Sequence, residues 1–304
     1  MNVYSLFRKA AQVIPNLTEL REVFLAANRV IADINSKWPG ELHTDQITRL
    51  WANTEESVTF AQAGGGDTML FTTNLQSKGV EEHSTIYILD SSNASNNGQF
   101  DVQSCVTVTV TITQNTVLSA GTETVNAAAF TLVNSLYPDT SSTIGKDYNI
   151  NARTNEITVD PKVKQILSVF VNNIELECVD REFVLDSDNK QYACYSMISR
   201  DKFVYPEQVF ATEGDVMSIK MLKKIPYFPD SALIKYTTNT INMPLVIEEL
   251  LFAGVLMMLL SKPQYSDEKA LELNTAMYTT GLVSLSQQEL DRSEPITREL
   301  NYKY

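Results

Sequence analysis

Apolar residues near the start of the chain recur at the spacing of an α-helix. Residues 3–13 form a short amphipathic stretch that ends before Pro15, because the residue preceding a proline is pushed out of the helical region. A longer apolar stripe follows, made of Leu17, Leu20, Val23, Phe24, Ala27, Val30, Ile31 and Ile34. Asn16 is placed to cap this second helix, with Glu19 completing a capping box. We therefore predict two helices, the second ending near Pro39.

From residue 41 to about residue 155 the pattern changes to that of β-structure. Charged residues become sparse, and Thr, Ser, Asn and Gln take their place. Residues 106–113 alternate between β-branched apolar residues and threonine, which is the period of a half-buried strand. Loops are predicted at 64–67, 91–98 and 141–145, where glycine, serine and asparagine gather. We expect several short antiparallel strands here, arranged as a sandwich or barrel.

The region 156–236 alternates more regularly and contains one clear hairpin signal. Asn172 and Asn173 separate two apolar arms, and asparagine tolerates the left-handed geometry of a tight turn. On the second arm, one face is predicted to carry Ile174, Leu176 and Cys178. Glu175 and Glu177 are then expected on the opposite face.

The rest of this region is also predicted as strands. A turn at 186–189 leads into a strand over 192–198. A further strand over 216–222 has one apolar face, made of Met217, Ile219 and Met221. Residues 223–236, which are rich in proline, aromatic residues and lysine, are expected to leave the region as an extended strand.

The chain returns to a helical pattern near its end. Pro244 suits the first turn of a helix over 245–260, and Ser266 is expected to cap the next helix. The apolar face predicted for that last helix consists of Ala270, Leu273 and Met277. Gly281 is expected to end it, and the polar residues 284–304 are either a free tail or a docking segment.

These patterns predict an α+β fold. The N- and C-terminal helices are expected to form a helical bundle, with a large antiparallel β region, sandwich-like or barrel-like, between them. The expected division is a discontinuous helical module of 1–40 and 237–283, a β-rich insertion of 41–155, a β domain of 156–236 and a docking tail of 284–304.

Charge and cysteine content exclude several classes of function. The chain of 304 residues has a formal net charge of −13, which argues against a protein that grips nucleic acid through its phosphates. Cys105, Cys178 and Cys194 are odd in number and widely spaced, so we expect three buried thiols in a reducing compartment rather than disulfides or a zinc site. The most apolar run, 250–260, is too short to span a membrane, and residues 1–11 do not resemble a secretory leader. We therefore expect an intracellular protein without a membrane contact.

No motif in the sequence predicts catalysis, a cofactor or a metal. The glycines at 64–66 are not followed by the lysine and hydroxyl residue that hold phosphate and magnesium. His43 and His83 have no companion at a metal-binding spacing. Glu175 and Glu177 would lie about 7 Å apart on one strand face, within range for an acid–base or metal pair. The alternation of the strand explains them without chemistry, as its solvent-facing side.

Two adjacent acids interrupt the apolar helix over 245–260. Glu248 and Glu249 point in directions about 100° apart on a helix, so we predict that they mark an edge facing solvent or another subunit. Pairing with an arginine of a neighbouring subunit is one hypothesis for them.

The order of elements resembles the head-to-tail connector family of tailed bacteriophages, which includes portal adaptors and gatekeepers of the tail-tubular-A type. The resemblance rests on the capped helix that ends in 28–35, the hairpin 169–176, the strand that follows Gly214 and Asp215, and the crossing through Pro226 and Pro229 into 245–260. It covers residues 1–40 and 156–283, and the block 41–155 looks like an insertion.

The resemblance implies a non-enzymatic protein of the virion neck or tail, assembled in the host cytoplasm. It would form a homo-oligomeric ring, usually dodecameric, beneath the portal protein and above tail tube, nozzle or fibre proteins. DNA would pass through the ring only as a transiting polymer, with no cofactor and no membrane involved. The C-terminal segment would dock on the portal, which gives as portal-docking candidates Glu289, Arg292, Arg298, Tyr302 and Tyr304. Glu248 and Glu249 would be subunit-interface candidates.

Two other classes of function stay open at this point. A β-rich tail-fibre or glycan-binding attachment protein would expose aromatic residues on the block 41–155. A hydrolase would use an acidic pair such as Glu175 and Glu177.

Overall fold

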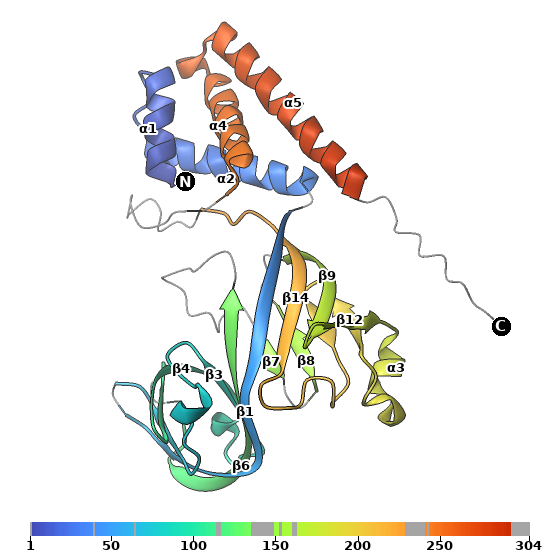
Figure 1. Ribbon diagram of the computed structural model, residues 1–304. Coiled ribbons are helices and arrows are strands. Elements are labelled where there is room, and N and C mark those ends of the chain that lie inside the picture. Colours follow the sequence, from blue (N-terminus) through green and yellow to red (C-terminus); the bar gives the residue numbers. More distant parts are fainter. Residues whose placement is uncertain are drawn as a thin grey trace, which may run out of the picture. The chain divides into compact units, whose positions relative to one another are not determined.

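The computed structural model of the chain is an α+β protein made of two compact units (Figure 1). Unit 1 combines residues 1–41 with 224–304, and unit 2 is residues 42–223. The structure describes residues 2–38, 40–63, 65–113, 117–134, 149–151, 154–159, 163–228, 241 and 243–292.

Unit 1 is helical, and the two ends of the chain build it together. Its helices are α1 (Val3–Val13), α2 (Leu20–Lys37), α4 (Leu245–Leu260) and α5 (Glu268–Arg292). They share one hydrophobic core, to which α2 contributes Val30, Ile31 and Ile34 and α4 contributes Leu251, Val255 and Leu259. None of the helices in the described part of the chain is long and apolar enough to cross a membrane.

The predicted limits of the first two helices are correct except at the start of α2. Helix α1 covers the predicted residues, and Asn2 caps it by accepting a hydrogen bond from the backbone N–H of Ser5. Helix α2 begins at Leu20, so the predicted cap at Asn16 is wrong. The reason is that Leu17 donates its N–H to the carbonyl of Ile14 and is buried, so that this turn places Leu17 in the core before the helix begins.

Helix α2 also holds the segment that leaves unit 2. The side-chain amide of Asn35 donates to the carbonyl of Ile225 at 2.9 Å and accepts from its N–H at 2.9 Å. Asn28, two turns earlier, makes the same pair of bonds with Phe228 at 3.0 and 2.8 Å. The two asparagine side chains thus satisfy backbone N–H and C=O groups that would otherwise need a neighbouring strand as their hydrogen-bond partner.

Two glycines allow helices α4 and α5 to approach closely. A Cβ atom on Gly254 would lie 2.7 Å from side-chain atoms of both Tyr278 and Val30, and one on Gly281 would lie 2.6 Å from Leu250. Gly281 therefore packs inside α5 instead of ending it, and the predicted stop there is wrong. The helix continues through residues 284–292, which had been expected to lie in the polar tail.

The buried face of α5 also differs from the predicted one. Its buried residues are Asn274, Tyr278, Leu282 and Leu285, whereas Leu273 and Met277 are exposed. The face of α5 that carries Tyr278 packs against the rest of unit 1, and the Tyr278 hydroxyl donates a hydrogen bond to Asp33 on α2 at 2.7 Å. Asp267, not Ser266, caps the helix by accepting the N–H of Ala270.

Unit 2 contains two antiparallel β-sheets that share a core. The larger sheet has the order β10-β9-β14-β1-β2-β5-β4-β3-β6, and the smaller has the order β11-β12-β13-β8-β7, in which the β11–β12 pair alone is parallel. The strands are β1 (Glu41–Ala61), β2 (Thr68–Phe71), β3 (Thr85–Leu89), β4 (Gly98–Val106), β5 (Thr109–Ile112), β6 (Gly121–Asn134), β7 (Asn149–Asn151), β8 (Glu156–Thr158), β9 (Val163–Val171), β10 (Ile174–Glu175), β11 (Glu177–Cys178), β12 (Cys194–Ser199), β13 (Lys202–Val204) and β14 (Val216–Lys223).

Part of the larger sheet closes into a barrel. Strand β1 pairs with β6 as well as with β2, so β1, β2, β5, β4, β3 and β6 form a closed ring. The interior contains Trp51, Phe60, Phe71, Phe100 and Val110. Strands β1 and β6 run for 21 and 14 residues, so the expectation of short strands is wrong for both.

The remainder of unit 2 is layered. Strands β9 and β14 pack against the smaller sheet through a core that includes Val169, Ile219, Phe203 and Tyr205. On the far side of the smaller sheet lies α3 (Arg181–Leu185), a helix that the sequence pattern did not predict. The core of the two sheets mixes residues from 41–155 and 156–236, so the predicted boundary at 155/156 does not separate two compact units.

The predicted hairpin turn at Asn172 and Asn173 is confirmed. Asn172 and Asn173 have φ of 51° and 67° and join β9 to β10.

Residues 106–113, predicted as one strand, are instead divided between β4 and β5 by a turn at Thr107, whose φ is 53°. Residues 224–228 lie along α2 without forming a strand, and 229–236, the rest of the predicted exit strand, lie outside the described residues.

Candidate functional site

The described residues contain no cluster of three or more His, Cys, Asp or Glu side chains that could hold a metal ion. His43 is buried in unit 2, and His83 is on an exposed turn. Of the three cysteines only Cys194 is buried, so the expectation of three buried thiols is wrong, and Cys178 is exposed. Burial raises the pKa of the Cys105 and Cys194 thiols, which keeps both protonated near neutral pH.

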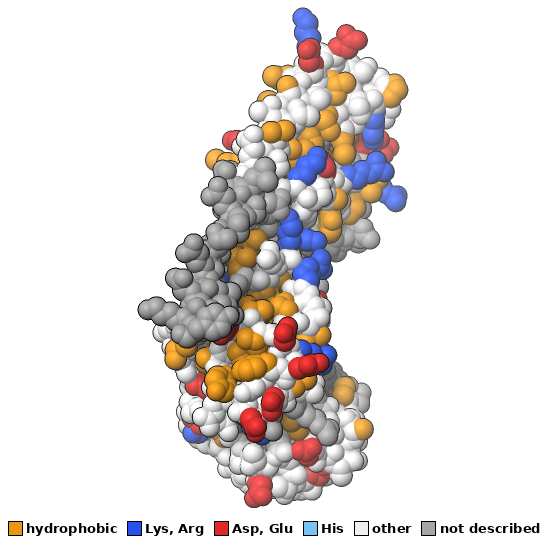
Figure 2. Space-filling view, turned by 90° about the vertical axis from the view of Figure 1, so that its right-hand side faces the viewer, with side chains coloured by type: hydrophobic (Ala, Val, Ile, Leu, Met, Phe, Trp, Pro, Cys, Tyr) orange, Lys and Arg blue, Asp and Glu red, His pale blue; other side chains and the backbone are white. Residues whose placement is uncertain are grey.

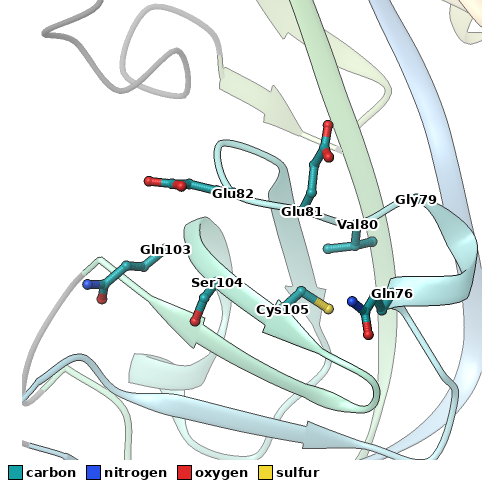
Figure 3. A pocket seen from close by; sticks show the side chains of 8 residues that line it. All are labelled: Gln76, Gly79, Val80, Glu81, Glu82, Gln103, Ser104 and Cys105. Carbon is teal, nitrogen blue, oxygen red and sulfur yellow. The ribbon is translucent and has the colours of Figure 1, made fainter.

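One open pocket of about 310 Å³ lies on the barrel (Figure 3). Its walls include the carboxylates of Glu81 and Glu82 and the thiol of Cys105. Figure 3 shows the sulfur pointing toward Gln76 and the two carboxylates pointing away from it. No histidine or lysine lines the pocket, so the thiol has no base beside it to activate it as a nucleophile.

The carboxylate pair Glu175 and Glu177 does not form the arrangement that the sequence suggested. Glu175 ends β10 in the larger sheet, whereas Glu177 begins β11 in the smaller one. The two therefore do not share a strand face, and both are exposed. Leu176 between them is buried, because the chain changes sheets at this point.

Glu56, a carboxylate of unit 2 whose pKa is shifted, holds the fold together. Glu56, 1% exposed, accepts hydrogen bonds from the N–H and the hydroxyl of both Thr72 and Thr73 and from the side-chain amide of Asn53. Burial by itself would raise the pKa of Glu56, but these bonds outweigh it and leave the pKa below the usual value. Glu56 thus ties the β-bulge of β1 to the end of β2.

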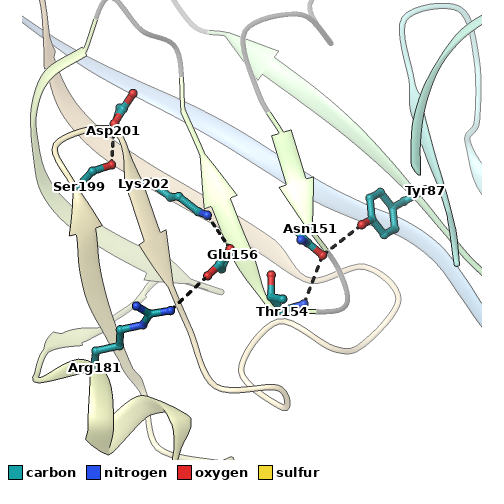
Figure 4. A network of polar contacts seen from close by, with 8 residues as sticks. All are labelled: Tyr87, Asn151, Thr154, Glu156, Arg181, Ser199, Asp201 and Lys202. Carbon is teal, nitrogen blue, oxygen red and sulfur yellow. Dashed lines mark hydrogen bonds and ion pairs between the residues drawn. The ribbon is translucent and has the colours of Figure 1, made fainter. Parts of the chain in front are cut away.

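A second polar network anchors α3 to the smaller sheet (Figure 4). Lys202 on β13 lies 2.6 Å from Glu156 on β8, and Arg181 at the start of α3 lies 3.8 Å from the same carboxylate. The hydrogen bond from Lys202, aided by the charge of Arg181, lowers the pKa of Glu156. Tyr87 of the barrel donates to Asn151 on β7 at 3.1 Å, which links the two sheets.

Both acids proposed as subunit-interface candidates lie in the first turns of α4. Glu248 is half-buried and Glu249 is exposed. Leu245 and Val246, just before them, are 69% and 64% exposed. The start of α4 therefore combines apolar and acidic side chains at the surface of unit 1.

The portal-docking candidates are only partly within the described residues. Glu289 and Arg292 belong to the last turns of α5, although their side chains are not described. Arg298, Tyr302 and Tyr304 lie outside the described residues.

A surface of α5 that the sequence analysis missed is the most unusual feature of unit 1. We call it the α5 face; its members are Leu273, Ala276, Met277, Thr280, Val283, Ser284 and Gln287, all exposed. No charged residue occurs between Glu272 and Glu289, although the solvent-facing side of a surface helix normally carries charges. The helical period of these positions could have revealed the face once Tyr278 was known to point inward.

Comparisons with known proteins do not add a family to this description. The sequence matches no protein-family model and no curated protein sequence.

Proposed function

We propose that this protein is a structural head-to-tail connector of a tailed bacteriophage, a portal adaptor whose ring extends the DNA channel from the portal to the tail. The fold supports the proposal, since both chain ends enter one helical unit and the β-rich unit is inserted between them, which is the order of elements on which the resemblance rests. In this proposal the four helices of unit 1 form the bundle that packs between subunits.

The observation that carries the proposal is the α5 face. Leu273 is 61% exposed and Met277 is 54% exposed in the isolated chain, and the residues around them are small and uncharged. Small residues allow a second helix to approach closely, and burying the apolar residues against that helix stabilises the contact. A neighbouring copy of the same chain would cover this face, with Glu248 and Glu249 at the edge of the contact.

The remaining parts of the proposal follow from charge and from the resemblance. A net charge of −13 keeps DNA phosphates off the wall, so that DNA passes as a transiting polymer. Glu289, Arg292, Arg298, Tyr302 and Tyr304 are the proposed portal contacts. The tail tube, nozzle or fibre proteins would contact unit 2, and the complex would reside in the neck of the virion. The proposal includes no enzymatic step and no cofactor.

The alternatives have less support. A glycan-binding module would need exposed aromatic rings on residues 41–155, but every aromatic residue described there is buried, namely Trp51, Phe60, Phe71, Tyr87, Phe100 and Phe130. A hydrolase based on Glu175 and Glu177 would need the two acids on one face, and they belong to different sheets.

The test is the oligomeric state of the purified full chain, alone and mixed with the portal protein encoded by the same genome. Light scattering and negative-stain electron microscopy are expected to show rings. Met277→Glu and Thr280→Glu, which place charge on the α5 face, should give folded monomers. Val106→Glu, at a 64% exposed position of unit 2, is the matched control and should leave rings intact. A chain that stays monomeric and does not bind the portal would contradict the proposal.

A further inference from the structure

The outer side of α3 presents a hydrophobic surface that unit 2 does not cover. Val184 of this short helix points inward and packs with Cys194 and Val204 of the smaller sheet. Its neighbours Phe183 and Leu185 are 41% and 59% exposed. Tyr192, at 58% exposed, joins them, because its ring meets that of Phe183 edge-on with centroids 5.7 Å apart. We refer to Phe183, Leu185 and Tyr192 as the α3 knob.

The knob is held firmly in place, so its exposure is not a consequence of a loose segment. The side-chain amide of Asn189 donates to the carbonyl of Phe183 at 3.1 Å, and Tyr192 donates its N–H to the carbonyl of Asn189 at 3.1 Å. The ion pair between Arg181 and Glu156 anchors the start of α3 (Figure 4). A surface that is already ordered loses little conformational entropy when it binds a partner.

Acidic residues flank the knob along the chain. The exposed acids next to it in the chain are Asp180, Glu182, Asp186 and Asp188. The two basic neighbours are already paired, Arg181 with Glu156 and Lys190 with Glu207 at 2.8 Å. Within the described part of the chain, Asp180, Glu182 and Asp188 have no ion-pair partner. Figure 2, which faces the side of Figure 1 that carries α3, shows hydrophobic side chains next to acidic ones, with basic side chains beside them.

From this combination we propose that the α3 knob is a docking site for a cationic segment of another protein, in which apolar side chains alternate with lysine or arginine. The three apolar side chains of the knob would form the desolvated centre of the contact, and the unpaired acids would form a rim that selects positive charge. The inference concerns unit 2 alone and does not depend on the ring proposed above.

The geometry favours a protein segment over a glycan. Sugars stack on an open aromatic face, and the edge-on contact at 69° between the rings of Phe183 and Tyr192 takes up part of one of the faces that this pair could offer. Leu185 adds an aliphatic side chain that suits a leucine or phenylalanine of a partner. The acidic rim repels nucleic acid.

The test uses a defined probe, a fluorescein-labelled peptide in which lysine alternates with leucine and phenylalanine, titrated with the full chain and followed by fluorescence anisotropy. Two further peptides, one with glutamate in place of lysine and one with serine in place of leucine and phenylalanine, separate the charge requirement from the apolar one. We expect the cationic apolar peptide to bind at least tenfold more tightly than either, and its binding to weaken with added salt.

Variants locate the binding on the knob. The double variants Phe183→Ser with Leu185→Ser, and Glu182→Lys with Asp188→Lys, should each weaken binding of the cationic apolar peptide at least tenfold. Val106→Ser and Glu55→Lys make the same kinds of change at exposed positions on the barrel and should leave the affinity unchanged. Circular dichroism of every variant verifies the fold, and light scattering verifies that the oligomeric state does not change.

Equal affinity of all variants would overturn the proposal, because it would show that the peptide binds the acidic chain non-specifically. Binding to a glycan array that the Phe183→Ser variant abolishes, without peptide binding, would also overturn it and assign the knob to a glycan. An unmodified chain that forms no rings but binds the cationic apolar peptide would count against the proposed function and leave this inference standing.

Discussion

Individual buried acids in unit 2 serve the fold, because backbone N–H groups and hydroxyls surround them. Asp67, which is fully buried, accepts the N–H groups of Ala63, Val117 and Leu118. Glu56 has no basic partner among the residues that the structure describes, and five hydrogen bonds stabilise its charge instead. Such residues would be mistaken for catalytic acids if burial and a shifted pKa were the only criteria.

Replacing Glu56 by glutamine should destabilise the barrel by about 1–3 kcal/mol, since the new amide would point a donor at groups that already donate. The variant should also change the pH dependence of stability. The pKa of Glu56 is lower in the folded protein than in the unfolded chain, so the ionised form favours folding above about pH 4.3. This contribution is lost as the pH falls through the lower folded pKa.

Urea unfolding at several pH values measures both effects. The wild type should lose more stability than Glu56→Gln between pH 5 and about pH 3. Glu55→Gln, at the exposed neighbouring position, is the control and should behave as the wild type does. Parallel pH profiles for the wild type and Glu56→Gln would show that the five hydrogen bonds do not stabilise the charge.

The sequence predicts single residues well only where the cause is local. The turn at Asn172 and Asn173 follows from the backbone preference of two adjacent asparagines, and the structure confirms it. The role of Glu56 depends on Thr72 and Thr73, which another strand brings to it, so the pattern around Glu56 gives no indication of it.

At the scale of elements, the clearest feature is the set of hydrogen bonds by which the side chains of Asn28 and Asn35 on α2 hold the backbone of residues 225–228. We call this set the α2 clamp. Asn35 is 7% exposed, whereas Asn28 is half-buried. Asn35→Ala would leave the N–H and the carbonyl of Ile225 without partners in a dry environment, and we expect a loss of about 1–3 kcal/mol. Asn28→Ala should cost less, because water can replace its bonds to Phe228.

Hydrogen exchange measures this clamp directly. The amide of Ile225 should exchange faster in Asn35→Ala, and the amide of Phe228 should exchange faster in Asn28→Ala, each with little effect on the other. Ser36→Ala, at the exposed position next to Asn35, is the control. Unchanged protection of both amides would mean that packing alone holds the segment.

Predicted elements fail where packing overrides a local rule. Glycine commonly follows the last residue of a helix, so Gly281 was expected to end α5. Gly281 lies inside α5 instead, because Leu250 occupies the space that a side chain there would need, and the helix continues. The alternation over 106–113 fits one strand as well as two, and the turn at Thr107 separates them because β5 pairs with both β2 and β4. Helix α3 has a single inward residue, Val184, which is too little to produce a periodic signal.

At the scale of the whole molecule, the chain builds two units with separate hydrophobic cores. The sequence predicted that both ends of the chain are helical and that the middle is β, since each signal extends over many residues. It placed an additional boundary at 155/156, because the pattern changes there, although strands from both sides share a core. The two tryptophans happen to report on the two units, Trp38 in the core of unit 1 and Trp51 in the barrel of unit 2.

The last prediction uses these two reporters to separate the units. Gly254→Ala adds a Cβ at 2.7 Å from Val30 and Tyr278, and we expect it to lower the stability of unit 1 by about 1–3 kcal/mol through overpacking. In a Trp51→Phe background, where fluorescence reports unit 1, the unfolding midpoint should fall. In a Trp38→Phe background, where fluorescence reports the barrel, the midpoint should stay unchanged, because the two cores are separate and we expect each to unfold cooperatively by itself. Gly65→Ala, where an added Cβ meets no atom within 4 Å, should shift neither midpoint. Equal shifts of both reporters by Gly254→Ala would show instead that the two units unfold as one.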